Sequence, residues 1–232
     1  AALAGVAQSA SKLGNDLRLL QHLGEVEEPF ETKQIGSSAM PYKRNPMRAE
    51  RICALARFVG NAAQNTGQTA ATQWLERTLD DSANRRLAIP EAFLAVDGIL
   101  QLVLDVSRGL VVRPKVVEAN LRRELPFLAT ENLLMEAVKG GGDRQELHER
   151  IRVHARAAAD RLKEGAAEGD LFDRLRADPA FAGVKNMLRD DLDPRPFVGR
   201  APEQVEEFLS AEVDPVLRDR ADLLGSSPEV NV

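Results

Sequence analysis

The sequence predicts an all-α fold, in which part of a bundle of long helices is followed by a smaller helical domain. Apolar residues make up 44% of the 232 residues, whereas aromatic residues make up only 4%. That composition favours long helices packed through small side chains and predicts almost no β-sheet. The length and the apolar content are sufficient for a buried core.

The first predicted helix runs from the start of the sequence to about Gly24. Apolar residues recur on one helical face at Val6, Ala10, Leu13, Leu17 and Leu20. Because the sequence begins inside this repeat and without methionine, we expect it to be the later part of a longer protein.

An acidic connector follows and leads into GSSAMPYKRNP, residues 36–46, which we call the 36–46 loop. At its far side Asn45 and Pro46 are placed as a helix N-cap and a first-turn proline, so a second helix is predicted over residues 47–64. The loop therefore ends on a helix N-terminus, where backbone N–H groups and the helix dipole favour anions.

A third and longer helix is predicted after a break at residues 66–81. Ser82 is placed as its N-cap, Gly109 closes it, and Pro90 is expected to bend it. At a rise of 1.5 Å per residue this helix would be about 40 Å long. Helices of that length usually belong to bundles.

A domain boundary is predicted near residue 112. Gly109 stops the long helix, and Pro114 can start a new one. Residues 1–112 are then expected to be the later part of a domain built as a bundle of long helices, and residues 113–232 a C-terminal helical domain.

Shorter helices are predicted in the second domain. Asp143 and Asp170 are placed as N-caps, and Pro202 as a first-turn residue. Cys53 and Trp74, in the first domain, are expected in the core.

The charge and cysteine content exclude several classes of protein. Thirty-one basic and 36 acidic residues are spread through the chain and give a net charge of −5, so neither nucleic acid nor an anionic membrane is indicated as a partner. The single cysteine excludes an internal disulfide framework. With no signal-like segment and no uninterrupted apolar run of 18 residues, we expect a cytoplasmic protein.

The 36–46 loop carries residues suited to chemistry on a carboxylate. Pro41 and Pro46 restrict the backbone, while Lys43 and Asn45 offer hydrogen-bond donors. Ser37, beside these donors, could act as a base if its alkoxide were stabilised. A polar turn between helices is the alternative, and the composition of the loop leaves both interpretations open.

A second cluster precedes and opens the long helix. Ser82 and Arg86 share a helical face, and Arg77 lies just before them. Two guanidinium groups at a helix N-terminus could hold a phosphate. The alternative is ordinary ion pairing with the neighbouring acidic residues Glu76, Asp80 and Asp81.

The three histidines show no spacing typical of a metal site. His148 and His154 lie among arginines on a predicted helix, which favours a solvated basic face. His22, near the end of the first helix, can interact with the helix dipole.

The 36–46 loop resembles the signature loop of the fumarase/aspartase superfamily, with the pattern Gly-Ser-Ser-x-Met-Pro-x-Lys-x-Asn-Pro matched at every fixed position. Within that superfamily, residues 74–86 and 124–152 are similar to the adenylosuccinate lyase family. The similarity extends over nearly the whole chain, to about residue 220.

This resemblance implies β-elimination of fumarate from adenylosuccinate, giving AMP, and from the succinylated aminoimidazole carboxamide ribotide of purine biosynthesis. It implies that Ser37 removes the Cβ proton, while Lys43 and Asn45 hold the carboxylates and stabilise the carbanion. It further implies that substrate is bound by Arg51, Arg77, Ser82 and Arg86, the last three at the nucleotide and its phosphate. No cofactor and no metal are implied.

The resemblance also implies a homotetramer with shared active sites. The general acid of the family is a histidine far upstream of the signature loop, and none of His22, His148 and His154 matches it. We therefore expect this chain alone to be inactive. Two alternatives remain: another fumarate-releasing lyase of the superfamily, or a non-catalytic helical assembly module.

Overall fold

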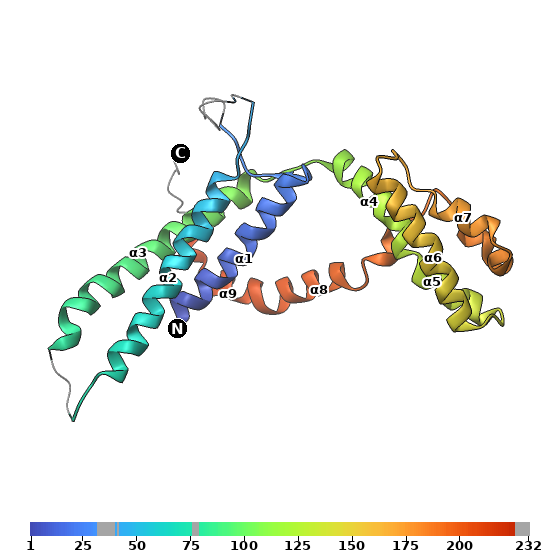
Figure 1. Ribbon diagram of the computed structural model, residues 1–232. Coiled ribbons are helices and arrows are strands. Elements are labelled where there is room, and N and C mark those ends of the chain that lie inside the picture. The colour runs from blue at the N-terminus through green and yellow to red at the C-terminus, as the bar shows by residue number, and fades with distance from the viewer. Residues whose placement is uncertain (32–39, 41, 76–78, 226–232) are drawn as a thin grey trace. The chain divides into compact units, whose positions relative to one another are not determined.

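The computed structural model describes residues 1–31, 40, 42–75 and 79–225. The prediction of an all-α fold is confirmed, since nearly all the regular structure is helical. The chain divides into two compact units, Ala1–Val116 and Val117–Leu224 (Figure 1). The division falls inside helix α4 (Pro114–Leu128).

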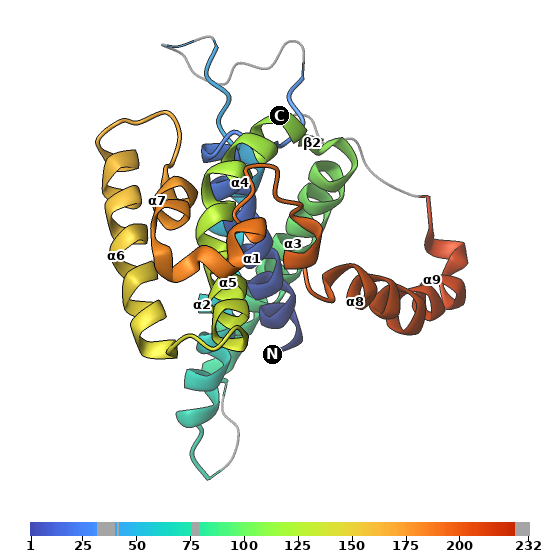
Figure 2. The same cartoon turned by 90° about the vertical axis from the view of Figure 1, so that its right-hand side faces the viewer.

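The first unit is built on α1 (Ala2–His22), α2 (Met47–Ala71) and α3 (Asp80–Gly109). The three helices lie side by side in Figures 1 and 2, and each contacts the other two. Their shared core consists mainly of small and branched side chains, including Ala7, Ala10, Ile52, Val59 and Ile99. Such small residues let long helices approach closely.

At Gly14, α1 approaches α2 closely. A Cβ atom at this position would lie 2.9 Å from Cys53 Sγ and 3.0 Å from the carbonyl oxygen of Ala49. The face of α1 that is buried therefore runs through Ala7, Ala10, Gly14 and Leu17. The face predicted from the sequence is rotated about the helix axis relative to this buried face. The reason is that a pattern of apolar residues does not count a glycine as a core residue.

A short ribbon joins the two ends of this helical layer. β1 (Val26–Glu27) follows α1 and pairs antiparallel with β2 (Val111–Val112), which follows α3, with Val26 opposite Val112. Next to the ribbon, the Arg113 N–H donates to the Glu25 carbonyl oxygen at 2.8 Å. The two-residue strands thus tie the connector before the 36–46 loop to the segment that follows α3.

Several predicted boundaries in the first unit were wrong. α2 continues to Ala71 instead of ending near residue 64, and α3 starts at Asp80, so Ser82 lies in its first turn. Pro90 lies within α3. The side chain of Trp74 is 87% exposed, contrary to the expectation of a core position, because it lies beyond the end of α2 where no described residue covers it. Cys53 is buried, as predicted.

α3 exposes a long apolar face. Its most apolar 18-residue window has a mean hydropathy of 1.8, and only 28% of that window is buried. By length and composition alone, this helix could cross a membrane. The exposed large apolar residues on it are Leu87, Ile89, Phe93, Leu94, Leu100 and Leu104.

The second unit continues from α4 through further helices and helical turns. These are α5 (Thr130–Lys139), α6 (Arg144–Lys163), α7 (Leu171–Ala177), η1 (Pro179–Met187), η2 (Arg195–Phe197), α8 (Ala201–Phe208), the π-helical turn η3 (Leu209–Val213), α9 (Asp214–Asp219) and η4 (Ala221–Leu223). α5, α6, α7 and η1 enclose a core that includes Leu133, Leu147, Leu175 and Phe181. Pro202 lies in the first turn of α8, as predicted.

The two predicted N-caps of this unit have different outcomes. Asp143 caps α6, because its carboxylate accepts hydrogen bonds from the N–H groups of Gln145 and Glu146, both at 2.9 Å. Asp170 occupies the N-cap position of α7 but makes no side-chain cap. Its carboxylate is instead 2.7 Å from Arg161 and 2.9 Å from Arg174, because two guanidinium groups compete with the helix N–H groups for it.

Because of the Asp170 ion pairs, the stability of the folded protein should fall more steeply as the pH is lowered. Arg174, together with Arg161, lowers the pKa of Asp170 from 3.8 to about 2. A carboxylate whose pKa is depressed in the folded state contributes stability above its unfolded pKa and loses that contribution as the pH falls through the folded pKa. We therefore expect Asp170→Asn to lower the unfolding temperature at neutral pH, and to show a shallower further fall than the parent between about pH 4 and about pH 2.

Thermal unfolding followed by circular dichroism across this pH range measures the effect. Asp173→Asn is the matched control, since Asp173 lies on the same helix with its side chain 73% exposed. Parallel curves for the parent and Asp170→Asn would contradict the prediction.

Candidate active site

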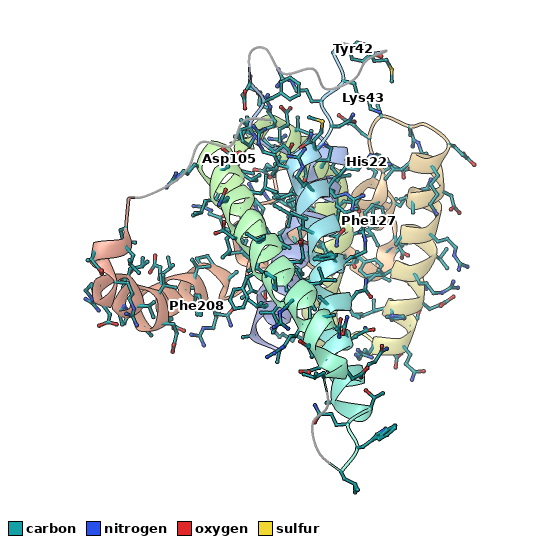
Figure 3. All side chains as sticks on the ribbon, turned by 90° about the vertical axis from the view of Figure 1, so that its left-hand side faces the viewer. His22, Tyr42, Lys43, Asp105, Phe127 and Phe208 are labelled. Carbon is teal, nitrogen blue, oxygen red and sulfur yellow. The ribbon has the colours of Figure 1, made fainter. Side chains whose placement is uncertain are left out.

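The structure places five of the seven predicted site residues, whereas Ser37 and Arg77 lie outside the described residues. Lys43 is exposed and Asn45 is half-buried on the segment that leads into α2. Figure 3 shows Tyr42 and Lys43 beyond the helices, at the end of the first unit where α3 carries Asp105. Arg51 is exposed on α2, about one turn after the start of that helix.

Two described segments lie on either side of the 36–46 loop, residues 27–31 before it and residues 42–48 at its end; we call them the loop base. Glu28, which is only 4% exposed, joins them. Its two carboxylate oxygens accept hydrogen bonds from the backbone N–H groups of Arg48 and Ala49, each at 3.0 Å. Burial raises the pKa of Glu28 above its usual value, although these N–H groups act in the opposite direction.

This contact corrects two sequence-based expectations. Pro46 is the N-cap residue of α2 and makes no side-chain cap, so Asn45 does not have the predicted capping role. N–H groups in the first turn of α2 are bound by Glu28 and are not offered to a substrate anion. Sequence reasoning missed this because the cap comes from a residue 20 positions earlier in the chain.

Arg48 is the second buried charge of the loop base, with 2% of the residue exposed. Its guanidinium donates to the Pro29 carbonyl oxygen and lies 2.9 Å from the Glu31 carboxylate. Its Nε atom is 2.7 Å from Asp105 on α3. Arg48 therefore connects the segment before the loop, the start of α2 and the end of α3.

An outer layer of polar contacts holds Arg44. Glu27 lies 3.0 Å from both Arg44 and Arg113, and the hydrogen bond from Arg113 is the main cause of the lowered pKa of Glu27. The Arg44 guanidinium stacks over the Phe30 ring at 5.2 Å from its centroid. The Gln21 side chain donates to the Arg44 carbonyl oxygen at 3.1 Å. The backbone just before Asn45 is thus tied to α1 and β1.

The predicted phosphate cluster lies elsewhere in the first unit. The Arg86 guanidinium donates to the hydroxyl and to the carbonyl oxygen of Ser82, so these two residues are brought together as expected from their spacing. Asn84, beside them, bonds to Asn65 of α2 at 2.9 Å. Asn65 is about five helical turns, or about 27 Å, from the start of α2 at Met47. One chain therefore does not bring Ser82 and Arg86 to Lys43 and Asn45.

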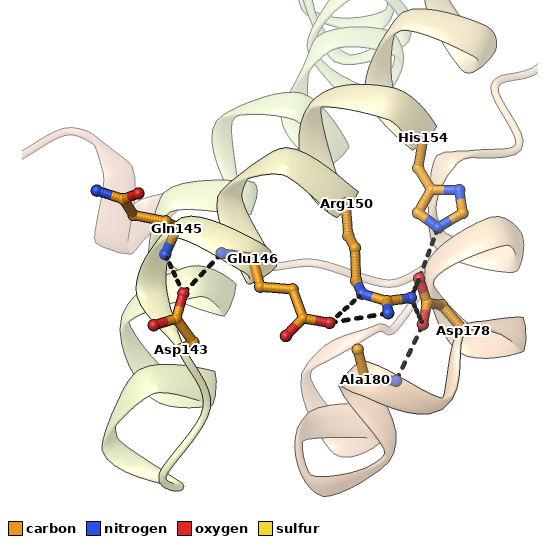
Figure 4. A network of polar contacts seen from close by, with 7 residues as sticks. All are labelled: Asp143, Gln145, Glu146, Arg150, His154, Asp178 and Ala180. Carbon is orange, nitrogen blue, oxygen red and sulfur yellow. Dashed lines mark hydrogen bonds and ion pairs between the residues drawn. The ribbon is translucent and has the colours of Figure 1, made fainter.

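His154 has a structural role that the sequence analysis did not foresee. It is half-buried, and its Nε2 atom lies 2.9 Å from the carboxylate of Asp178, which also contacts Arg150 and the Ala180 N–H (Figure 4). Burial by itself would raise the pKa of Asp178, but these hydrogen bonds outweigh it and lower the pKa. The prediction of a solvated face was wrong for His154, because Asp178 approaches from a distant part of the chain. His148 and His22 are exposed.

Among the residues that the structure describes, no group of three or more His, Cys, Asp or Glu side chains could hold a metal ion. The side chains in and beside the loop base that could contact a ligand are cations and hydrogen-bond donors. Lys43, Asn45 and Arg51 provide donors suited to carboxylates, on or beside a segment held by the ion pairs of the buried Arg48.

Comparison with known proteins agrees with this description. Residues 1–60 match the family model described as lyase, and residues 126–208 match the model described as adenylosuccinate lyase C-terminus. The chain is 52% identical to adenylosuccinate lyase of Saccharomyces cerevisiae over 94% of its own length and 45% of that protein. It is 48% identical to adenylosuccinate lyase of Schistosoma mansoni over its whole length and 48% of that protein.

A solved structure resembles the fold as well. The crystal structure of fumarate lyase from Mesorhizobium sp. BNC1 aligns with a TM-score of 0.72 at 29% identity, over 90% of this chain and 45% of that one. The helical architecture and the matched regions define a lyase. The chain belongs to the adenylosuccinate lyase family, and its similarity falls on the C-terminal portion of that family. It spans about half the length of the curated relatives it matches.

Proposed function

We propose that the full-length protein containing this chain is an adenylosuccinate lyase. It would cleave the C–N bond of adenylosuccinate to give AMP and fumarate, and would act likewise on the succinylated aminoimidazole carboxamide ribotide. The observation that carries the proposal is the complete signature pattern of the 36–46 loop, in a chain 52% identical to a yeast relative of that name.

The proposed roles follow the loop pattern. Ser37 removes the Cβ proton of the succinyl group, and Lys43 and Asn45 bind the carboxylates and stabilise the carbanion as it forms. Arg51 contacts the substrate from the first turns of α2. The anchored loop base supports these roles, because a carbanion is best stabilised by donors that are already in place.

Arg77, Ser82 and Arg86 are proposed to bind the nucleotide phosphate. The hydrogen bonds between Arg86 and Ser82 support this assignment, since they bring a guanidinium to the first turn of α3. The separation from Lys43 supports a further proposal: each active site combines the loop of one subunit with the phosphate cluster of another. We propose a homotetramer in which the exposed apolar face of α3 is covered by other subunits.

In this assembly, the apolar face of α3 is covered by other subunits and not by membrane lipid. Its apolar face would be buried among helices, in keeping with a family of soluble lyases. We propose a cytoplasmic location for the protein on the same ground.

Substrate comparison tests the proposed function. The full-length protein should release fumarate from adenylosuccinate and not from argininosuccinate, because only the first carries a phosphate for the Arg86 cluster. Ultraviolet absorbance of fumarate provides the readout. Turnover of argininosuccinate with none of adenylosuccinate would favour another fumarate-releasing lyase, and turnover of neither would refute the proposal.

The chain alone should be inactive, because the family's general acid has no counterpart among its three histidines. A general acid or base typically contributes about 10²–10⁴-fold to the rate. A non-catalytic helical assembly module is the alternative interpretation of this chain taken alone.

A further inference from the structure

We infer that Arg48 is a positioning residue for the elimination reaction, acting with Glu28 to hold Lys43 and Asn45 where they meet the substrate. The inference rests on the proposed function. Arg48 is not part of the signature pattern and is not proposed to touch the substrate. The structure assigns it a role because it joins the chain on both sides of the loop.

Arg48 is buried, and its burial has to be compensated. A guanidinium taken out of water is costly unless ion pairs and hydrogen bonds replace its hydration. Arg48 is 2% exposed, and its partners come from two separate elements: Pro29 and Glu31 before the loop, and Asp105 on α3. If Arg48 only stabilised the N-terminus of α2, partners from one of these two elements would be enough.

Glu28 pairs with the same helical turn. Glu28 binds the backbone N–H of Arg48 while the side chain of Arg48 binds Pro29 and Glu31. Residues 28–31 and the start of α2 are therefore joined in both directions. Arg48 thus joins residues 28–31 to the start of α2 through its main chain and its side chain.

Lys43 and Asn45 lie close to this anchor in sequence. The Met47 N–H donates to the Asn45 carbonyl oxygen at 2.9 Å, and the Lys43 N–H donates to the Met40 carbonyl oxygen at 3.0 Å. Both proposed substrate-binding residues therefore lie close in sequence to the turn that holds Arg48, on either side of the Arg44 backbone that Gln21 of α1 also holds. Movement of that turn displaces them directly, and a misplacement of about 1 Å can reduce the rate by about 100-fold.

The choice of arginine is part of the inference. Its planar fork presents donors in several fixed directions, and lysine provides a single compact charge. Arg48→Lys keeps the positive charge for Asp105 and Glu31 but cannot match the geometry of the fork. Arg48→Met keeps most of the apolar stem and leaves both carboxylates without this cation. The two variants should therefore form a graded series.

The test uses full-length protein with the variants Arg48→Met, Arg48→Lys and Glu28→Gln. Steady-state kcat and KM for adenylosuccinate are measured well below each unfolding temperature, and hydrogen exchange is followed in peptides covering residues 28–31 and 42–49. Ile99→Ala is the control, because it removes a fully buried core side chain of α3 away from the loop base.

We expect Arg48→Met to lower kcat/KM by about 100-fold, with faster exchange confined to those two segments. Arg48→Lys and Glu28→Gln should lose less, and Ile99→Ala should lower the unfolding temperature while retaining kcat/KM. A loss in Arg48→Met no larger than that in Ile99→Ala would overturn the inference and leave Arg48 a stabilising residue only.

Two readouts keep this result separate from the proposed function. If the parent protein does not cleave adenylosuccinate, the proposed function fails, and hydrogen exchange decides the anchoring role alone: local acceleration supports it and unchanged exchange refutes it. If Arg48→Met does not fold, Arg48→Lys and Glu28→Gln carry the test. Parent-like kcat/KM in both would contradict the inference.

Discussion

Ser37→Ala in the full-length protein is expected to lower fumarate release from adenylosuccinate by about 10²–10⁴-fold, the usual contribution of a general base. The reason is that alanine keeps the size of the residue close to that of serine but has no oxygen to accept the Cβ proton. Substrate binding should change little, because the proposed carboxylate and phosphate contacts come from other residues. The loss should therefore appear in kcat and not in KM.

Ser38→Ala is the comparison variant, since it removes a hydroxyl from the next position of the same loop. Initial rates over a range of adenylosuccinate concentrations give both parameters. A larger fall in kcat for Ser38→Ala than for Ser37→Ala would show that the base has been assigned to the wrong serine.

Activity should return when two inactive variants of the full-length protein are mixed. Ser37→Ala damages the 36–46 loop, and Arg86→Ala damages the phosphate cluster, which lies about 27 Å or more along α2 from the start of that helix. If each site takes its loop and its phosphate cluster from different subunits, a mixed tetramer contains some sites with neither defect. Ser37→Ala is expected to lose about 10²–10⁴-fold as a missing general base, and Arg86→Ala loses a guanidinium proposed to bind the phosphate. Even a minority of intact sites should therefore give more activity than the two variants measured separately.

The mixing experiment consists of co-refolding the two variants, or exchanging their subunits, and then measuring fumarate release. A pair with both defects in one loop, Ser37→Ala and Lys43→Met, provides the control. Every site formed from that pair carries one of the two defects, so no activity should return. Equal recovery in both pairs, or recovery in neither, would contradict shared active sites.

The general fold could be predicted from the sequence because its signals are local. Low aromatic content, helical periodicity and the prolines at positions 114 and 202 depend only on neighbouring residues, and the helices they predicted are present. The 36–46 loop was identified for the same reason, since its pattern is contiguous. Where a helix ends was less predictable: α2 continued through a polar stretch to Ala71 because α3 packs beside it.

The anchor of the loop base could not be predicted, because it depends on residues far apart in sequence. Glu28 meets Arg48 across 20 positions, and Arg48 meets Asp105 only when α2 and α3 are packed together. His154 and Asp178 are a similar case, separated by 24 positions. Each of these charged residues looks like an ordinary surface residue until the tertiary structure gives it a buried partner.

The close approach of α1 to α2 at Gly14 has a consequence for thiol chemistry. Cys53 is the single cysteine of the sequence, is 2% exposed, and has its Sγ atom where a side chain at position 14 would otherwise lie. An alkylating reagent can reach this sulfur only when the two helices separate. The rate of alkylation therefore reports how often α1 and α2 separate. Cys53 can serve as a probe of local opening in the first unit, because it lies on the helix that begins at the loop base.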